Sequence, residues 1–303
     1  MGQQRPAFSI VIPTRARPGQ LAACLRAISR LCYPPERFEV IVVDDGSPTE
    51  LAPAVAAFAE RLDLTLLRQS RTGPAGARNA GAARARRAFL VFTDDDCAPA
   101  PDWLDALAAR FVAAPDHAVG GRKLNALADN PYSTASQTIT DAAYRYHNAH
   151  SGSARFLSSA NLALPADRFR AIGGFDPAFR TSEDRELCDR WLQHGYRLTY
   201  APEARVYHAH ALTLGAYWRQ QFSYGRGASR FHRSRARRGR GRFRPDPTFY
   251  LDLLRHPLRQ GPSRRAPWLV ALLLVGQAAN AAGFFWEEAA RRAAEPSAGP
   301  GDG

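Results

Sequence analysis

Short apolar runs alternate with helical patterns of apolar residues through the first hundred positions of the chain. The apolar runs have the length of buried strands, and the segments between them repeat apolar residues every three or four positions. This alternation predicts an α/β fold in which a mostly parallel central sheet is flanked by helices. We expect strands at 8–14, 38–45, 64–69 and 89–96, and helices at 21–31, 51–62 and 75–88.

Beyond residue 98 the pattern is less regular, although it is still typical of one mixed domain that ends near residue 225. Residues 129–153 form a polar, tyrosine-bearing stretch with no clear preference. We expect helices at 101–112 and 183–194, strands at 117–124 and 154–165, and an extended segment at 197–210.

The C-terminal part of the chain holds two segments of unusual composition. Nine arginines lie between Arg226 and Arg244, and we expect a basic linker over 226–263. Residues 266–286 contain no charge, over a length that a helix would extend to about 30 Å, close to the thickness of a bilayer core. We predict an apolar helix over 264–290 and a disordered tail at 291–303.

Two interpretations of the apolar helix are open. Its polar Gln277 and Asn280 make spontaneous spanning of a membrane marginal. Gly276, Asn280 and Gly283 share one face, where small residues admit a neighbouring helix. The helix is therefore either embedded in a membrane or packed on the protein or in a dimer.

The formal net charge of +13 comes almost wholly from arginine, since Lys123 is the only lysine. Such a charge favours anionic partners, including phosphates, nucleic acid and acidic lipids. The four cysteines show no CxxC spacing, which is typical of single thiols in a reducing cytosol. The first 14 residues lack the pattern of a signal peptide, so we expect a cytoplasmic protein.

Acidic residues follow two of the predicted strands. Asp44 and Asp45 end the second strand, and Asp94, Asp95 and Asp96 end the fourth. The carboxyl ends of parallel strands are where open α/β sheets bind ligands. Adjacent carboxylates repel one another unless water or a cation screens them. A solvated turn before a helix is the alternative, and the other motifs have to decide.

Taken with these motifs, the chain resembles the inverting glycosyltransferase family 2, whose nucleotide-sugar domain is called GT-A. The motifs occur in order between Phe8 and Leu214: SIVIPTRAR, VVDDGS, GPAGARNAG, FTDDDCAPAPDWL, SANLALP, GGFD, SEDREL and VYHAH. Each is weak alone, but the ordered set is specific. The resemblance implies a GT-A domain over 1–225, with a nucleotide-binding half at 6–97 and an acceptor half at 98–225.

The resemblance also implies where the donor binds. A carboxylate at Asp45 suits the N–H of a uracil or guanine base, which can only donate there. Gly73 permits close approach of the backbone, and the helix start at Arg78 lies near the donor phosphates. The implied donor-binding residues are Pro13, Thr14, Arg15, Asp44, Asp45, Gly73, Arg78, Asn79, Asp94 and Asp95.

The DDD segment resembles the DxD motif of that family, which binds a divalent cation. We expect Asp96 to hold Mn²⁺ or Mg²⁺, because hard cations prefer oxygen ligands. His208 would complete the coordination, with His210 as its rival. In the SEDREL segment, Asp184 is the expected base that accepts the proton of an acceptor hydroxyl, with Glu183 as its neighbour or substitute. A helix cap is the alternative role of that acidic pair.

The sequence thus predicts metal-dependent transfer of a sugar, with inversion, from a nucleoside diphosphate sugar to a hydroxyl acceptor. We favour a UDP-sugar donor and a saccharide or lipid-linked acceptor, in cell-envelope polysaccharide or glycolipid synthesis at the inner face of the membrane. No GxGxxG follows a strand and no Walker lysine occurs, which argues against dehydrogenases and P-loop enzymes.

The alternative is a non-catalytic protein whose arginine-rich segment binds anions at a membrane surface or on nucleic acid. That segment has only Phe231 and Phe243 as stacking residues and no recognisable reader motif. We therefore expect no nucleic-acid partner.

Overall fold

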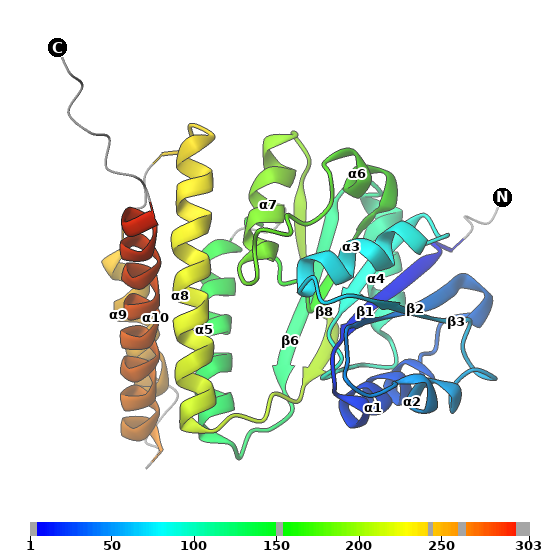
Figure 1. Ribbon diagram of the computed structural model, residues 1–303, viewed down its shortest axis with the longest axis horizontal. Helices are drawn as coiled ribbons and strands as arrows, with labels where there is room; N and C mark the ends of the chain where they lie inside the picture. The colour runs from blue at the N-terminus through cyan, green and yellow to red at the C-terminus, as the bar shows by residue number, and fades with distance from the viewer. Residues whose placement is uncertain (1–4, 150–153, 242–244, 260–264, 295–303) are drawn as a thin grey trace.

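An eight-stranded mixed sheet lies at the centre of the computed structural model, which describes residues 5–149, 154–241, 245–259 and 265–294 (Figure 1). Its strand order is β3-β2-β1-β4-β7-β6-β8-β5. The first four of these strands are parallel, as is the β6–β8 pair, whereas β7 is antiparallel to β4 and β6, and β5 to β8. The strands are β1 (Phe8–Thr14), β2 (Phe38–Asp45), β3 (Leu64–Gln69), β4 (Phe89–Thr93), β5 (Cys97–Pro99), β6 (Ala118–Asn125), β7 (Asn161–Pro165) and β8 (Leu198–His208).

Helices cover both faces of the sheet because its central strands are apolar on both sides. Leu25 of α1, Val55 of α2 and Trp103 of α4 pack on one face. Ala77 of α3 and Trp191 of α7 pack on the other, together with α6. These helices are α1 (Pro18–Ile28), α2 (Ala52–Ala56), α3 (Pro74–Arg84), α4 (Trp103–Ala113), α6 (Ala166–Ala171) and α7 (Glu183–Gln193), and a 3₁₀ turn, η1, spans Pro35–Arg37.

A separate layer of four helices stands beside the sheet, at the left in Figure 1. It contains α5 (Pro131–His147), α8 (Leu214–Arg237), α9 (Pro247–Arg259) and α10 (Ala266–Ala294), which share their own apolar cluster. Helix α5 occupies most of the stretch for which the sequence showed no preference. It begins there because the Asn130 side chain caps it, accepting from the backbone N–H groups of Tyr132 and Ser133.

The expected basic linker over 226–263 is wrong where the structure describes it. Helix α8 continues through the expected boundary at residue 225, and α9 occupies 247–259, while 242–244 and 260–264 lie outside the described residues. Arginines of α8, and Arg238 directly after it, pair with buried acids that lie far away in the sequence. Arg226 and Arg230 pair with Glu287 of α10 at 2.8 and 2.6 Å, and Arg238 pairs with Glu186 of α7 at 3.1 Å.

The apolar C-terminal segment forms one helix of 29 residues, α10. It is long and apolar enough to cross a membrane by length and composition alone. One of its faces packs closely on α8, since a Cβ added at Gly225 or Gly283 would overlap a backbone carbonyl of the other helix. The expected contact of its small residues with another helix is therefore confirmed. Helix α10 also includes residues 291–294 of the expected tail, and 295–303 lie outside the described residues.

Candidate active site

The three consecutive aspartates form a turn between β4 and β5, because β4 ends at Thr93 and not at residue 96 as expected. Each carboxylate has a different surrounding. Asp95 is buried, whereas Asp94 and Asp96 are half-buried. The three acids of the turn therefore have different surroundings at the carboxyl edge of the sheet, although Asp95 and Asp96 share Arg17 as a partner.

Asp95 is bound to the end of β1. Its carboxylate accepts from the Thr14 hydroxyl at 2.7 Å and from the Arg17 guanidinium at 3.2 Å. Burial raises the pKa of Asp95 to about 6, and these two contacts offset only part of that effect. The carboxylate is thus held in place by donors from the first strand and the loop after it.

Asp96 faces His208, at the end of β8, and its geometry fits a cation. One oxygen, Oδ1, is buried without a hydrogen-bond partner and lies 3.2 Å from the His208 Nε2. Burial alone would raise the pKa of Asp96, but His208, His210 and Arg17 outweigh it and hold the pKa at about 2. The carboxylate is therefore ionised and available to a hard metal ion.

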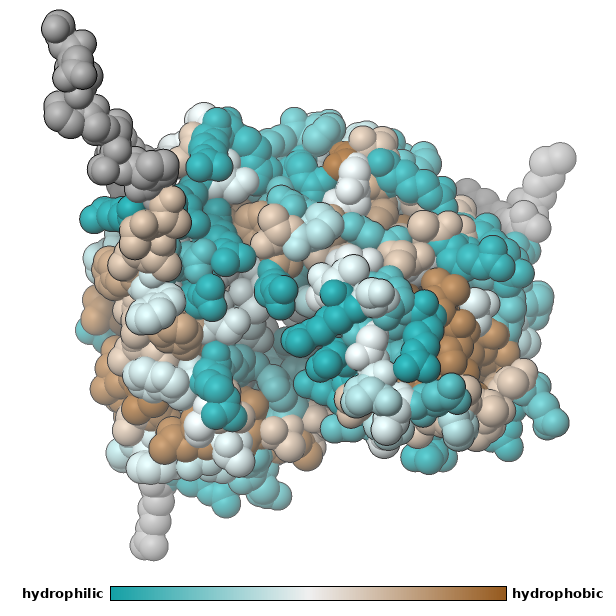
Figure 2. Space-filling view, in the orientation of Figure 1, coloured by the Kyte–Doolittle hydropathy of each residue, from teal (hydrophilic) through white to brown (hydrophobic). Residues whose placement is uncertain are grey.

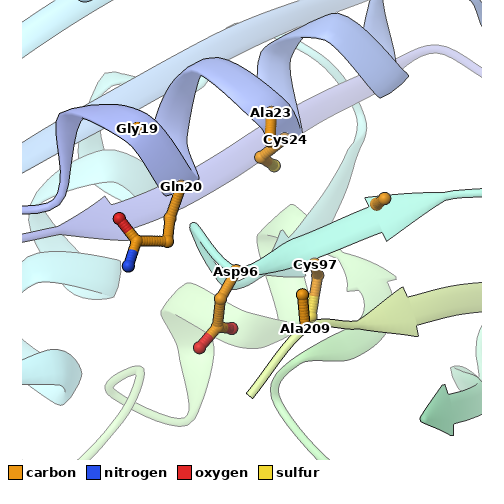
Figure 3. A pocket seen from close by; sticks show the side chains of 8 residues that line it. Gly19, Gln20, Ala23, Cys24, Asp96, Cys97 and Ala209 are labelled. Carbon is orange, nitrogen blue, oxygen red and sulfur yellow. The ribbon is translucent and has the colours of Figure 1, made fainter. Parts of the chain in front are cut away.

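The third group near this pair is Cys97, whose Sγ lies within 4.8 Å of the ligand atoms of Asp96 and His208. Burial raises the pKa of this thiol well above its usual value, and a soft sulfur ligand suits Mn²⁺ or Mg²⁺ less well than oxygen does. A cavity of about 270 Å³ opens beside Asp96, between α1 and β5. Figure 3 shows the side chains of Gln20, from α1, and Asp96, from the aspartate turn, among those that line this cavity.

His210 lies beside His208, with 5.0 Å between the ring centroids, but its ring is engaged elsewhere. The Gln220 amide nitrogen, which can only donate, lies 3.1 Å from the His210 Nδ1. The Gln220 carbonyl is fixed in turn by the Ser136 hydroxyl at 3.0 Å. Burial lowers the pKa of His210 to about 4. His210 is therefore neutral, with its remaining proton on Nε2, and His208 is the better placed ligand.

Arg78 connects the aspartate turn with the start of α7. Its guanidinium donates to Asp94 at 2.6 Å and to Glu183 at 2.9 Å, and it lies 5.6 Å from the centre of the Phe175 ring. The side chain is only 3% exposed. A buried ion pair is costly unless both charges are satisfied, and here one arginine is shared by two acids that come from different parts of the fold.

Glu183 and Asp184 differ in what surrounds them. Glu183 is buried and paired with Arg78, yet burial outweighs that pairing and raises its pKa to about 7. Asp184 is half-buried, and burial raises its pKa as well. One Asp184 oxygen accepts from the backbone N–H of Arg185 at 2.8 Å. Asp184 has the freer carboxylate of the two.

The carboxylate of Asp45 holds the loop between β3 and α3. It accepts from the Gln69 amide at 2.9 Å, from the Thr72 N–H at 2.8 Å and from the Gly73 N–H at 2.9 Å. Gly73 has a φ of 90°, a conformation that glycine adopts without strain. Asp44 accepts from the Ser47 N–H and closes the turn after β2. The two acids therefore shape the rim on which the donor base is expected.

The remaining expected donor residues differ in their exposure and in their contacts within the fold. Pro13 is half-buried and Arg15 is exposed. Asn79 is used within the fold, since its amide both donates to and accepts from the backbone of Phe175. It ties α3 to the GGFD turn. Whether any of these side chains touches a donor stays a prediction.

Two polar groups at the site were not expected from the sequence. Arg17 lies 3.2 Å from Asp95 and 3.3 Å from Asp96, whereas the motif had drawn attention to Arg15. Ala16, with a φ of 54°, turns the chain between them and brings Arg17 back over the sheet edge. Gln220 comes from α8, beyond the last recognisable motif. Only the fold shows that it reaches the site.

Comparison with known proteins shows similarity to glycosyltransferases. The family model for glycosyl transferase family 2 matches residues 9–169, more than half of the chain. The chain is 31% identical over 232 residues to a pre-mycofactocin glycosyltransferase of Mycobacterium tuberculosis, covering 73% of this chain and 46% of that protein. It is 27% identical to the glycosyltransferase AglE of Haloferax volcanii, covering 73% of each. The chain thus spans about half the length of the first relative.

Solved structures show the same fold. The mannosyltransferase PcManGT from Pyrobaculum calidifontis, in complex with GDP-Man and Mn²⁺, aligns with a TM-score of 0.60 at 22% identity, over 97% of this chain and 82% of that one. TarS 1-349 of S. aureus, in complex with UDP-GlcNAc, aligns with a TM-score of 0.54 at 15% identity, over 95% and 92%. The expected GT-A fold is confirmed, with a more mixed sheet than the sequence indicated. Together with the family match, these results show that the chain belongs to glycosyl transferase family 2.

Proposed function

We propose that the chain transfers a sugar, with inversion, from a nucleoside diphosphate sugar to a hydroxyl acceptor in a metal-dependent reaction. The observation that carries the proposal is the double contact of Arg78 with Asp94 and Glu183. It joins the aspartate turn to the acidic start of α7 across one cleft. Displacement at an anomeric carbon needs a base opposite the departing phosphate. The contact of Arg78 brings the acids expected at the donor phosphates close to the acids expected to supply that base.

Asp184 is the base in this proposal. The acceptor hydroxyl must reach the carboxylate, and Glu183 is buried and occupied by Arg78, whereas Asp184 is half-buried. Burial raises the pKa of Asp184, which makes its carboxylate a stronger proton acceptor. Glu183 then acts by holding Arg78 in position.

Asp96 and His208 would hold the divalent cation, Mn²⁺ or Mg²⁺. Their paired oxygen and nitrogen atoms, with the unsatisfied Asp96 Oδ1, form a donor set that suits such ions. A bound cation would offset the charge that develops on the departing diphosphate. Arg17, which contacts both Asp95 and Asp96, would add positive charge at the same edge.

The site and the relatives support a choice of donor and acceptor class. We favour a UDP-sugar, held at the rim that Asp45 shapes, since structures with this fold have been solved with UDP-GlcNAc and with GDP-Man. For the acceptor we favour a saccharide or lipid-linked hydroxyl in cell-envelope synthesis, at the cytoplasmic face of the membrane. A relative of this chain is an O-antigen chain rhamnosyltransferase. The non-catalytic alternative is disfavoured, because Arg226, Arg230 and Arg238 are already paired with acids.

The test is a comparison of Asp184→Asn with Glu183→Gln in a sugar-transfer assay with Mn²⁺. Asp184→Asn should lower kcat by about 10²- to 10⁴-fold, the usual contribution of a general base, with calorimetric donor binding unchanged. Glu183→Gln should lower kcat less, since Gln can still accept from Arg78. Proton NMR of the product gives the anomeric configuration. A fully active Asp184→Asn enzyme, or a product with retained configuration, would contradict the proposal.

A further inference from the structure

Helix α10 presents a continuous apolar face to the outside of the molecule. Only 28% of its most apolar window is buried, so it is not a core helix. The exposed positions recur every three or four residues, which places them on one side. This outer face consists of Pro267, Ala271, Leu274, Ala278, Phe285 and Ala289, with Trp268 and Trp286 beside it.

The outer face is large and uniform. Trp268, Leu274, Phe285 and Trp286 are between 52% and 68% exposed. All of α10 is described, and no charged or amide side chain interrupts the face between residues 267 and 290, roughly 35 Å along the helix. Figure 2 shows apolar side chains along this edge of the molecule, at the left. Apolar surface of this extent marks an interaction site.

The opposite face of α10 prevents the helix from spanning a membrane while it is docked. Glu287 is buried there and receives Arg226 at 2.8 Å and Arg230 at 2.6 Å, and Glu288 receives Arg233 at 2.7 Å. Tyr217 of α8 lies against Gly276 in the middle of α10. A spanning α10 would therefore also carry α8 into the hydrocarbon, with the exposed Arg219 close to the centre, where an arginine costs about 2.5 to 3.5 kcal/mol. Docked α10 therefore contacts lipid only along its outer face.

Helix α9 extends the same surface and adds positive charge. Leu253 of α9 packs with Leu272 and Leu273 of α10 in one cluster. On its exposed side, α9 carries Leu251 and Leu258, which are 49% and 58% exposed, together with Arg255 and with Arg259, which pairs with the exposed Asp252 at 3.4 Å. Exposed Arg265 and Arg292 lie near the two ends of α10. Arginines beside aliphatic and aromatic residues suit anionic head groups above an acyl layer.

We propose that the outer faces of α9 and α10 form a membrane-docking surface that enters the head-group boundary of an anionic bilayer, with α10 parallel to the membrane plane. A lipid surface fits better than a second protein, because specific protein interfaces use hydrogen bonds to set their register, and the outer face of α10 offers few side-chain donors. The net charge of +13 adds attraction to an anionic surface.

This docking also has a consequence for the acceptor, which rests on the proposed function. Helix α8 contacts α10 through Gly225 on one side and reaches the site through Gln220 and its contact with His210. The membrane would therefore lie about two helix diameters, roughly 20 Å, from the acceptor side of the site. An acceptor attached to a membrane lipid could enter from that side.

The first test is flotation of the full chain with vesicles of phosphatidylcholine alone, or of an equal mixture of phosphatidylcholine and phosphatidylglycerol. Leu274→Glu is compared with Val112→Glu on α4, because both side chains are 52% exposed. We expect binding to the mixed vesicles, much weaker binding to phosphatidylcholine, and a loss of about tenfold or more for Leu274→Glu only. Equal binding of the two variants, or no binding of the parent chain, would overturn the proposal.

The second test measures the depth of α10. Cys32→Ser removes the exposed thiol and leaves only buried ones, so single cysteines can be introduced at Ala271, Ala278 and Ala289 for spin labels. Equal, shallow depths at the three positions support docking in the plane of the membrane. A maximum depth at residue 278 would show a spanning helix instead. Light scattering completes the test by measuring the oligomeric state. If the parent chain is a dimer that does not bind vesicles, and Leu274→Glu converts it to a monomer, the outer face contacts a second copy and the proposal is overturned.

Discussion

Replacing Glu183 by Gln should make the protein more stable above neutral pH. Glu183 is buried beside Arg78, but burial raises its pKa from 4.5 to about 7. Between these values the folded protein binds a proton that the unfolded chain has already released, so stability falls as the pH rises. Conversion at about 1.4 kcal/mol per pKa unit gives a loss of about 3 kcal/mol by pH 8. Gln has no proton to lose and avoids this cost.

The measurement is the free energy of unfolding in urea, followed by circular dichroism between pH 5 and pH 8.5. At pH 5 the variant and the parent should be nearly equal, and the difference should grow to about 3 kcal/mol in favour of the variant. Glu39 provides a control with the opposite sign. It is also buried and paired with an arginine, Arg86, but its contacts with Arg86 and Ser9 outweigh burial and lower its pKa.

Glu39→Gln should therefore destabilise the protein at neutral pH, with a penalty that disappears as the pH falls below about 4.5. Parallel pH profiles for Glu183→Gln and the parent protein would refute the reasoning, since they would mean that Arg78 keeps Glu183 ionised throughout. If Glu183→Gln is stabilising and nearly inactive, the charged form of Glu183 lowers stability but is required for catalysis.

Three further changes test other parts of the structure. Gly225→Val should cost about 1 to 3 kcal/mol in urea unfolding, because its side chain would overlap the backbone of Asn280; an unchanged midpoint would mean that α8 and α10 are not in close contact. Arg17→Gln should tighten calorimetric Mn²⁺ binding up to about fivefold, as expected when a half-exposed competing cation is removed. Gln220→Leu should lower kcat about tenfold, because it frees the His210 ring that lies against the expected metal ligand His208; normal activity would show that this contact is dispensable.

The sequence predicts those elements that can be recognised from their own residues alone. Strands such as β1 and β2 are buried on both faces, so their apolar runs identify them without reference to other parts of the chain. The short β5 was missed because a strand of three residues, Cys97–Pro99, exists only through its pairing with β8. Helix α2 ends at Ala56, well before the expected residue 62, since turns replace its second half.

The candidate site likewise has a part that the sequence predicts and a part that it does not. Acidic motifs show where the carboxylates lie, because they follow strands whose ends must meet at one edge. The partners of these acids cannot be read from the motifs, since Arg78 and Glu183 are separated by more than a hundred residues and come together only in the folded chain. Arg17 escaped notice because its position depends on the left-handed backbone at Ala16, a non-glycine residue that gives no signal of such a turn.

Helix α8 explains why the arginine-rich segment belongs to the catalytic unit. Its Gly227 lies against Thr181 and Ser182, the residues just before Glu183 and Asp184, where a Cβ would have no room. The Thr181 hydroxyl donates to the backbone of Ser223 on the same helix. Because Arg226 and Arg230 fix α8 to α10 through Glu287, the acidic start of α7 rests on a helix that α10 holds in place. Removal of α10 should therefore disturb the proposed base as well as the proposed membrane contact. If residues 226–263 were only a linker, removal of α10 would leave the base unaffected.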